Sequence, residues 1–283
     1  MLKLQNLLSL FRVDQWPKNL LIFSPIFLSE PYFQSDSLID LLPLFALFIV
    51  LSSIVYTLND LFDYTKDKIN PFKKKRPLVL GTINKSEAVK ALIILVLFFF
   101  TLGLFVINKI TLIVLIFYFF LNLVYNLILK KIFLIDIIIV SFGYVLRVFS
   151  SYVELNFEVN IILLAGIFLL SLIILLIKRK VEYNSLTFQK TLSIYSNEKV
   201  FFKIFYFVNL LTIVIYYFFI KELLEIKSTI ISFLPVIISL YRILSYLKNN
   251  RIYHNISNTL LTDPVILISF FVWFSIIIIN ISF

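Results

Sequence analysis

The sequence contains no cysteine, one methionine, one histidine and four glycines among 283 residues. Without cysteine the chain cannot form disulfides, use a thiol nucleophile or bind a metal through thiolates. Charge is also scarce, because only 15% of the residues are charged, against about 25% in ordinary soluble domains. Hydrophobic residues make up 61% of the chain and gather in long runs. The composition therefore predicts an all-α, polytopic membrane protein.

Nine apolar segments have roughly the length needed to cross about 30 Å of hydrocarbon. The first is the weakest, because Pro25 and Pro31 interrupt it and Glu30 ends it. The stretch before it, 1–16, is too short and interrupted for a signal peptide, so we expect an amphipathic helix on the membrane surface. The nine expected spans are 18–35, 41–58, 88–107, 111–128, 133–152, 159–177, 200–220, 228–247 and 264–283.

The basic residues predict an orientation. With the N-terminus inside, only Lys109, Lys221 and Lys227 of 26 basic residues fall in outer connections. The positive-inside rule therefore favours an N-in, C-out topology, with the protein in the cell membrane. The net charge of +10 is explained by this topology and by anionic lipid, and nucleic acid is not an expected partner.

Two inner connections, 59–87 and 178–199, are longer than a turn between spans requires. The outer connections are short, so we expect an active site that faces the cytoplasm, where soluble phosphorylated substrates occur. No linker, repeat or low-complexity tail separates a second domain, and the chain 1–283 is interpreted as one domain. The sequence gives no indication of the oligomeric state.

An amide and three carboxylates follow the second apolar run. On a continuous helix, at about 100° per residue, Asn59, Asp60, Asp63 and Asp67 fall within an arc of about 100°. Carboxylates this close repel one another and require a counter-cation. Mg²⁺ suits their oxygen ligands and completes its shell with water or substrate phosphate. The alternative is a solvated helix end neutralised by neighbouring lysines.

The basic run Lys73-Lys74-Lys75-Arg76 comes directly after these acids. Arg76 can grip a phosphate in a bidentate way, whereas Lys73 and Lys74 act as point charges. Such runs also enforce topology, but the position after the carboxylates favours a site for a Mg²⁺–diphosphate.

Arg147 lies deep in an otherwise apolar span, which by default marks a functional site. Its structural alternative is an ion pair with Asp136 or another carboxylate. Asp136 begins the same expected helix, where it can serve as a helix-dipole partner or as a ligand. Tyr125, Asn126 and Lys130 end the preceding span on the inner side.

The second inner connection opens with Lys178-Arg179-Lys180-Val181-Glu182. Lys178 and Glu182 are four residues apart, so a surface salt bridge is an alternative to a role in the site. His254 is interpreted as a loop residue. Asp263-Pro264 is interpreted as the cap and first position of the last helix.

These motifs resemble the UbiA superfamily of intramembrane prenyltransferases. The resemblance rests first on Asn59-Asp60-x-x-Asp63-x-x-x-Asp67, with Tyr56 before it and Asn70-Pro71-x-Lys73-Lys74-x-Arg76-Pro77 after it. Arg12-x-x-Gln15-Trp16-x-Lys18-Asn19, Tyr125-Asn126, Asp136 and Gly143-Tyr144-Val145-Leu146-Arg147 support it. It implies a nine-span helical bundle whose aspartates bind a Mg²⁺–diphosphate.

Within the superfamily, the sequence looks most like the decaprenyl-phosphate phosphoribosyltransferase branch. Enzymes that prenylate aromatic acceptors usually carry a second Asp-rich motif, whereas no aspartate occurs here between Asp136 and Asp263. Lys178-Arg179-Lys180-Val181-Glu182 stands in that place. Departures from the branch are Asn70, where His is common, and Phe149-Ser150-Ser151 after Arg147.

The resemblance implies transfer of 5-phosphoribosyl from phosphoribosyl diphosphate, a phosphorylated small-molecule donor, to an isoprenoid lipid phosphate. The alternatives are transfer of a prenyl group to an aromatic acceptor and, from another class, a transporter. Asp60, Asp63 and Arg147 are the expected catalytic residues. The expected metal ligands are Asn59, Asp60, Asp63, Asp67 and Glu182; phosphate ligands, Lys18, Lys73, Lys74, Arg76, Lys130, Lys178 and Arg179; and substrate contacts, Tyr56, Tyr125 and Asp136.

Overall fold

The computed structural model describes residues 2–28, 35–69, 73–132, 134–185, 197–248 and 262–282. Within these ranges every regular element is a helix, which confirms the predicted fold class. The chain divides into two compact units, Met1–Val159 and Asn160–Phe283, and each is described by itself. The expectation of a single domain stays a prediction.

Among the described residues, seven helices are long and apolar enough to cross a membrane. They coincide with seven of the expected spans. A further apolar helix, Pro264–Asn280, is shorter. The seven are Ser37–Phe62, Lys85–Val106, Lys109–Leu127, Ile135–Leu155, Ile161–Tyr183, Glu198–Leu223 and Ile226–Leu247. The count of nine and the N-in, C-out orientation stay predictions.

The expected first span, 18–35, is not one continuous helix. A 3₁₀ helix, η1 (Val13–Phe23), is followed by the short α2 (Ser24–Leu28). Pro17 lies inside η1 and Pro25 inside α2, and proline lacks the N–H that a regular helix needs. Glu30 and Pro31 lie outside the described residues.

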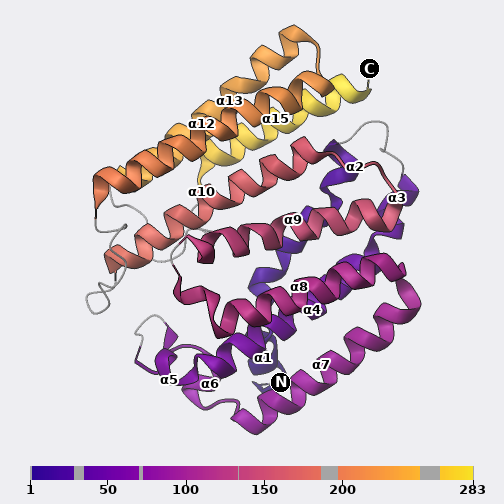
Figure 1. Cartoon of the computed structure of the whole chain (residues 1–283), viewed down its shortest axis with the longest axis vertical. Helices are drawn as coiled ribbons and strands as arrows, with labels where there is room; N and C mark the ends of the chain where they lie inside the picture. Colours follow the sequence, from indigo (N-terminus) through magenta and orange to yellow (C-terminus); the bar gives the residue numbers. More distant parts are fainter. Residues whose placement is uncertain are drawn as a thin grey trace. The chain divides into compact units, whose positions relative to one another are not determined.

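The first unit is built around α4 (Leu42–Phe62), which packs against α7 (Lys85–Val106) and α8 (Lys109–Leu127), as Figure 1 shows. Phe48 and Leu51 of α4 and Leu115 of α8 are fully buried, and Phe99 of α7 is nearly so. A Cβ at Gly103 would lie 2.8 Å from Leu112 Cδ1, so glycine permits the close approach of α7 and α8. The other helices are α1 (Leu2–Leu10), α3 (Ser35–Asp40), α5 (Tyr64–Asp67), α6 (Pro77–Leu80), η3 (Leu129–Lys131) and α9 (Ile135–Leu155).

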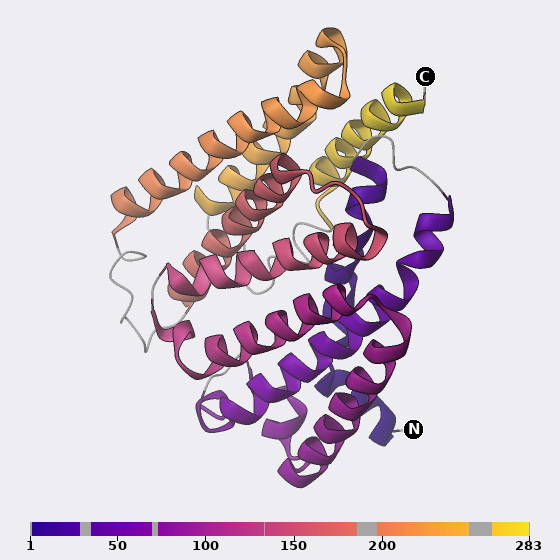
Figure 2. The same cartoon turned by 45° about the vertical axis from the view of Figure 1, so that its right-hand side comes forward.

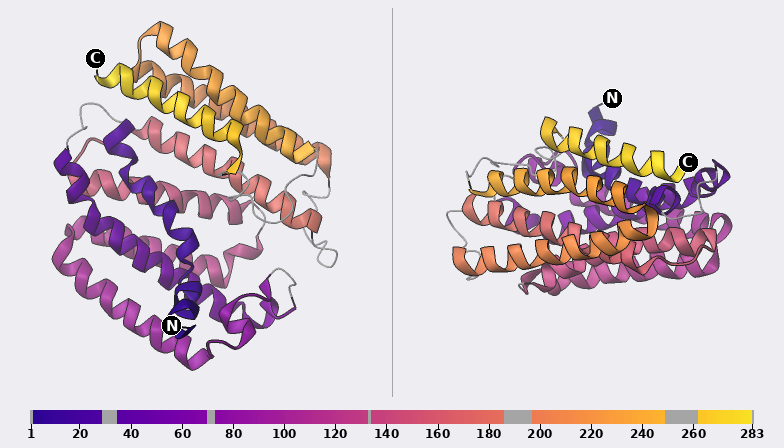
Figure 3. Two further views of the ribbon diagram at one scale, coloured as in Figure 1. Left: turned by 180° about the vertical axis from the view of Figure 1, so that it is seen from behind. Right: turned by 90° about the horizontal axis from the view of Figure 1, so that it is seen from above.

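Hydrogen bonds fasten η1 between α4 and α9. Trp16 Nε1 donates to Ser53 Oγ over 3.3 Å, and Ser52 Oγ donates to Asn19 Oδ1 over 3.3 Å. On the other side, Ser151 Oγ donates to the Ile22 carbonyl over 2.6 Å. Seen from behind, the N-terminal segment runs over these helices (Figure 3). A 3₁₀ segment thus brings polar side chains into the helical interior.

The N-terminal helix α1 was expected to lie on the membrane surface. It is helical, but Leu10 is fully buried against Leu78, Ile83 and Ala88. Leu4 remains 63% exposed. Helix α1 therefore also packs against the connection after α5, and this contact brings the next residues towards the acidic motif.

The connection between α5 and α7 is ordered by local backbone chemistry. Gly81 ends α6 with φ 74°, a left-handed conformation that glycine adopts without a Cβ penalty. Asn84 caps α7, because its side chain accepts from Glu87 N over 2.8 Å and Glu87 accepts from Asn84 N over 3.1 Å. These two features end α6 and begin α7 within a few residues after the basic run.

The second unit contains α10 (Ile161–Ser185), α12 (Glu198–Leu223), α13 (Ile226–Lys248) and α15 (Pro264–Ser282). Figure 2 shows these four helices from a second direction. Tyr216 OH lies 2.8 Å from Ser232 Oγ and accepts from Trp273 Nε1 over 2.9 Å, so α12, α13 and α15 share a hydrogen-bonded core. Asp263 Oδ1 accepts from Ile266 N over 3.1 Å, which confirms Asp263 as the cap of the last helix.

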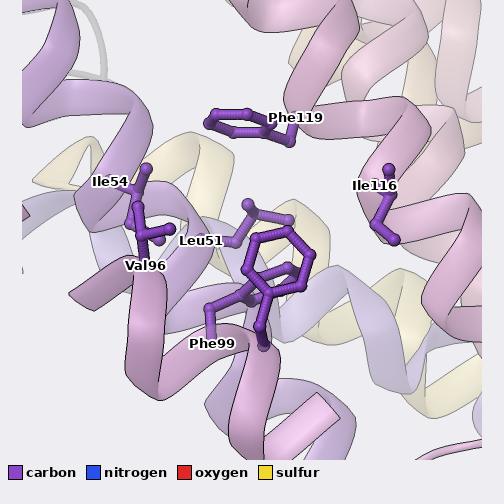
Figure 4. A pocket seen from close by; sticks show the side chains of 7 residues that line it. Leu51, Ile54, Val96, Phe99, Ile116 and Phe119 are labelled. Atoms are coloured by element: carbon purple, nitrogen blue, oxygen red, sulfur yellow. The ribbon is translucent and has the colours of Figure 1, made fainter. Parts of the chain in front are cut away.

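A small apolar pocket lies between α4, α7 and α8 of the first unit (Figure 4). Its walls carry no polar side chain, so it offers no ligand for a metal or a phosphate. The chemistry of the chain must be sought elsewhere. The lining residues are Leu51, Ile54, Val96, Phe99, Phe100, Ile116 and Phe119.

Candidate active site

The three aspartates of the acidic motif are buried at the end of α4 and in α5. Asp60, Asp63 and Asp67 are only 2%, 8% and 1% exposed. Helix α4 ends at Phe62, yet Asp63 N still donates to Asn59 O and Asp67 N to Asp63 O. The helical hydrogen-bond spacing therefore continues through the break at Asp63. The aspartates are therefore enclosed and not solvated.

Four basic side chains converge on these carboxylates. Asp63 Oδ1 lies 2.6 Å from Nζ of Lys130, which belongs to η3, the short helix after α8. Asp67 pairs with Arg76 and with Lys73, whose Nζ lies 2.9 Å from Oδ1. Three of the predicted phosphate-binding residues thus meet the predicted acidic face.

Asp60 is shared by two arginines. Its Oδ1 lies 3.0 Å from Arg76 Nη1 and also accepts from Arg12 Nη2. Burial lowers the pKa of Arg76, and Arg12 acts in the same direction, while Asp60 and Asp67 oppose the shift. A cluster of cations around a cluster of carboxylates can exchange partners when an anion and a metal enter together.

Arg12 reaches Asp60 because the backbone reverses direction between α1 and η1. Arg12 itself has φ 53° and ψ 57°, a left-handed conformation that costs a non-glycine residue about 1–2 kcal/mol. Its guanidinium lies 5.0 Å from the centre of the Tyr56 ring. Arg12 therefore joins the acidic motif to the aromatic side chain one turn before it on α4.

The donor set fits a hard divalent cation. Asn59, Asp60, Asp63 and Asp67 offer oxygen atoms, which Mg²⁺ prefers. Within the described ranges, no three acidic or histidine side chains form a ready-made metal cage. The carboxylates face basic side chains instead. That arrangement suits an ion held by one or two carboxylates together with substrate phosphates, the usual mode for Mg²⁺.

A second buried charge lies in the same unit. Arg147 is 6% exposed and donates from Nε to Asn19 Oδ1 over 2.9 Å, from Nη1 to Gly143 O over 2.8 Å and from Nη2 to Tyr118 OH over 2.7 Å. Its guanidinium also lies 4.9 Å from the Tyr118 ring centre and 5.3 Å from that of Tyr144. Among the described residues no carboxylate pairs with it.

The alternative of an Arg147–Asp136 ion pair is thus not what the structure shows. Asp136 is buried in the first turn of α9 and accepts from Tyr125 OH over 2.6 Å. Tyr125 and Asp136, both predicted substrate contacts, therefore form one unit. Lys18 is half-buried on η1, Asn59 is half-buried on α4, and Lys74 is exposed.

Lys178, Arg179 and Glu182 belong to the second unit, at the end of α10. Glu182 lies 2.6 Å from Arg179 Nη1 and 4.0 Å from Lys178 Nζ. These are the pairs of an exposed helix surface, each worth about 0.2–0.5 kcal/mol. A role for these three residues in the site stays a prediction. His254, Asn70 and Pro71 lie outside the described residues.

Arg12, Asn19 and Tyr118 were not among the predicted site residues. Arg12 and Asn19 stand in the N-terminal motif that supported the resemblance, but their partners lie 48 and 128 positions away in sequence. No helical periodicity links such positions. The available signal was the presence of an arginine and an asparagine beside a weak, proline-containing apolar run.

Comparison with solved structures supports the fold. A UbiA homolog from Archaeoglobus fulgidus bound to DMAPP and Mg²⁺ has a TM-score of 0.66 and 20% identity, covering 98% of this chain and 99% of that one. The same homolog bound to GPP and Mg²⁺ has a TM-score of 0.68 and 20% identity, covering 98% and 100%. A digeranylgeranylglyceryl phosphate synthase has a TM-score of 0.68 and 21% identity, and both chains are covered completely.

The sequence comparison gives one relative and one family match. An uncharacterized protein, y4nM, of Sinorhizobium fredii (strain NBRC 101917 / NGR234) is 28% identical over 146 residues, which is 52% of this chain. The match spans only 28% of that relative's length. Residues 22–259 match the UbiA prenyltransferase family, and this range contains the acidic motif, the basic run and Arg147. The chain belongs to the UbiA prenyltransferase family.

Proposed function

We propose that the protein transfers 5-phosphoribosyl from phosphoribosyl diphosphate to a polyprenyl phosphate within the membrane. The observation that carries the proposal is the buried acidic cluster of Asp60, Asp63 and Asp67, surrounded by Arg12, Lys73, Arg76 and Lys130. Opposite charges arranged in this way can receive a diphosphate together with its cation.

Mg²⁺, held by Asn59, Asp60, Asp63 and Asp67, would neutralise the charge of the pyrophosphate leaving group. Lys73, Arg76 and Lys130, together with Lys74 and with Lys18 of η1, would bind phosphate oxygens of the donor. Lys73 and Arg76 both pair with Asp67. Each side chain could exchange this carboxylate for a phosphate oxygen of a donor bound beside it. Glu182, Lys178 and Arg179 are proposed as further contacts from the second inner connection.

The reaction breaks the bond between ribose C1 and the pyrophosphate oxygen, and pyrophosphate departs with the bonding electrons. A phosphate oxygen of the lipid forms the new bond to C1. Because this oxygen is already anionic, no side chain needs to remove a proton from it. This requirement fits a site whose side chains are carboxylates paired with cations and which holds no nucleophile–base pair of the hydrolase type.

A second candidate is transfer of a prenyl group from a polyprenyl diphosphate to an aromatic or other small acceptor. The specific observation in its favour is that the solved homolog was bound to DMAPP and GPP with Mg²⁺. Against it, the sequence has no aspartate between Asp136 and Asp263, so the second Asp-rich motif of such enzymes is missing.

The two candidates are separated by supplying purified protein and Mg²⁺ with one of two labelled substrate pairs. One pair is phosphoribosyl diphosphate and decaprenyl phosphate, and the other is a polyprenyl diphosphate and 4-hydroxybenzoate. We expect a lipid-linked phosphoribosyl product from the first pair. Product from the second pair alone would reject the phosphoribosyl proposal and favour prenyl transfer.

A further inference from the structure

The buried polar side chain of Asn19 has one half of its amide bonded and the other half without a partner. Asn19 is 1% exposed, and its Oδ1 accepts from Arg147 Nε over 2.9 Å and from Ser52 Oγ over 3.3 Å. Its Nδ2 is enclosed and has no hydrogen-bond acceptor among the described residues. A buried donor left in this state is costly in free energy.

The orientation of this amide is determined by its neighbour. A guanidinium can only donate hydrogen bonds, so Asn19 must present Oδ1 to Arg147. Exchanging the two ends of the amide would place two donors against each other. The unpartnered atom is therefore Nδ2, and the assignment follows from chemistry as well as from the coordinates.

The positive charge of the neighbouring Arg147 indicates which kind of ligand would accept a hydrogen bond from Asn19 Nδ2. Arg147 donates three hydrogen bonds to neutral oxygens, and a guanidinium has five donor hydrogens. No carboxylate within the described part of the chain balances its charge. A cation buried among neutral groups, next to an unused amide donor, favours an anionic oxygen.

The place of Asn19 distinguishes this position from the acidic cluster. Ser52, its hydrogen-bond partner, lies eight residues before Asp60 on α4, which corresponds to about 12 Å along a helix. The cations at the acidic cluster are already paired with Asp60, Asp63 and Asp67, whereas Arg147 has no carboxylate partner among the described residues. The donor diphosphate and a second anion can therefore occupy different ends of the same stretch of α4.

We propose that Asn19 Nδ2 donates a hydrogen bond to the anionic headgroup of the acceptor, which Arg147 holds beside it, and that Asn19 thereby selects a phosphorylated lipid over its alcohol. This inference rests on the proposed function for the identity of the acceptor, a polyprenyl phosphate. It adds a specificity-determining residue from η1, a segment that precedes the first long spanning helix.

The test replaces Asn19 by aspartate in the full chain. Asn19→Asp keeps an oxygen for Arg147 and strengthens that contact by charge, but it removes the Nδ2 donor and repels an anion. We expect the thermal unfolding midpoint of the protein alone to stay or rise, while its affinity for decaprenyl phosphate falls about 10–100-fold. Binding is measured in detergent without Mg²⁺ or donor. A purely structural residue would lower stability and affinity together.

Two comparisons make the result specific. Asn209→Leu removes another asparagine of a spanning helix, one whose Nδ2 is already bonded to the Phe205 carbonyl over 2.7 Å, and should leave the affinity unchanged. The unphosphorylated decaprenol should bind wild type and Asn19→Asp equally weakly. If Asn19→Asp does not fold, Asn19→Ser also lacks Nδ2 and replaces it in the measurement.

The outcomes separate this inference from the proposed function. Unchanged decaprenyl phosphate affinity in Asn19→Asp, or an equal loss for decaprenol, overturns the role of Asn19. If 4-hydroxybenzoate binds wild type but not Asn19→Asp, and decaprenyl phosphate binds neither, the anion site stands with a carboxylate as its occupant. The phosphoribosyl proposal then fails. Binding of inorganic phosphate without binding of decaprenyl phosphate would overturn the selection of a lipid acceptor.

Discussion

The two units enclose polar side chains of different kinds. The first encloses Asp60, Asp67 and Arg147, and their partners come from segments far apart in the sequence. The second encloses a neutral network, in which Tyr216 bonds both Ser232 and Trp273. It also buries Lys180 and Asp263, but the side chains of their ion-pair partners, Glu198 and Arg242, are 75% and 36% exposed. Its buried Lys180 lies 3.9 Å from Glu198 and 5.5 Å from the centre of the Phe201 ring.

The difference indicates where chemistry takes place. Ionised groups inside a membrane protein are expensive and are retained chiefly at functional sites. Neutral hydroxyl and indole groups that satisfy one another mainly hold helices together. We therefore expect the reaction centre in the first unit, whereas the neutral network of the second unit is of the kind that stabilises packing. The predictions below test this comparison.

The largest effect is expected from Asp60→Asn. The change keeps the size of the side chain but leaves Arg12 and Arg76 with one carboxylate fewer and removes a metal ligand. We expect kcat/KM, followed by pyrophosphate release, to fall more than about 100-fold, in the range found when a group that stabilises transition-state charge is removed. Glu225→Gln, at an exposed position of the second unit, is the control. Turnover near the wild-type level in Asp60→Asn would contradict the location of the site.

Lys130→Gln should have the next largest effect. Lys130 comes from the connection after α8 and contacts Asp63 over 2.6 Å, so the change leaves Asp63 without its cation. We expect kcat/KM to fall about 10–100-fold, as for residues that orient ligands of a metal site. The matched control is Lys221→Gln at the exposed end of α12. Equal effects of the two substitutions would mean that Lys130 acts only through net charge.

The sequence predicted the helical fold and the acidic cluster because both depend on local patterns. Long apolar runs determine spans, and a spacing of three or four residues gathers side chains on one helical face. Asp60, Asp63 and Asp67 illustrate this: their backbone hydrogen bonds keep helical spacing although α4 ends at Phe62. Lys73 and Arg76 were predicted as phosphate ligands from chemistry and order along the chain, and Lys130 from the family resemblance.

The sequence did not predict the parts that depend on tertiary packing. Arg12 reaches Asp60 through a left-handed turn, and η1 replaces the regular helix expected from residue 18. Pro17 and Pro25 indicated that the helix would be interrupted, but no local rule specified a 3₁₀ segment pinned by Ser52, Ser53 and Ser151. The partners of Arg147 were likewise beyond reach, because they come from η1, α8 and α9.

In the second unit, Tyr216→Phe should lower stability with little effect on turnover. The change removes the hydroxyl that joins Ser232 and Trp273 across three helices. Hydrogen bonds of this kind in membrane proteins are worth about 0.6–1.7 kcal/mol. We expect the free energy of unfolding in detergent to fall by about that amount, with kcat/KM within about twofold of wild type. A loss of activity as large as in Lys130→Gln would contradict the view that the network of the second unit only stabilises packing.

The smallest effect is expected at Asp263, which begins α15 and accepts hydrogen bonds from Arg242, Tyr246 and Ile266 N. Burial alone would raise the pKa of Asp263, but these hydrogen bonds outweigh it and hold the pKa below its usual value. A lowered native pKa means that the carboxylate stabilises the fold above the unfolded pKa of about 3.9 and loses that contribution as the pH falls through the native value. The difference in unfolding midpoint between wild type and Asp263→Asn should therefore be present at neutral pH and shrink below about pH 4. A difference that persists in acid would show that the amide alters packing, because the charge could then no longer be its cause.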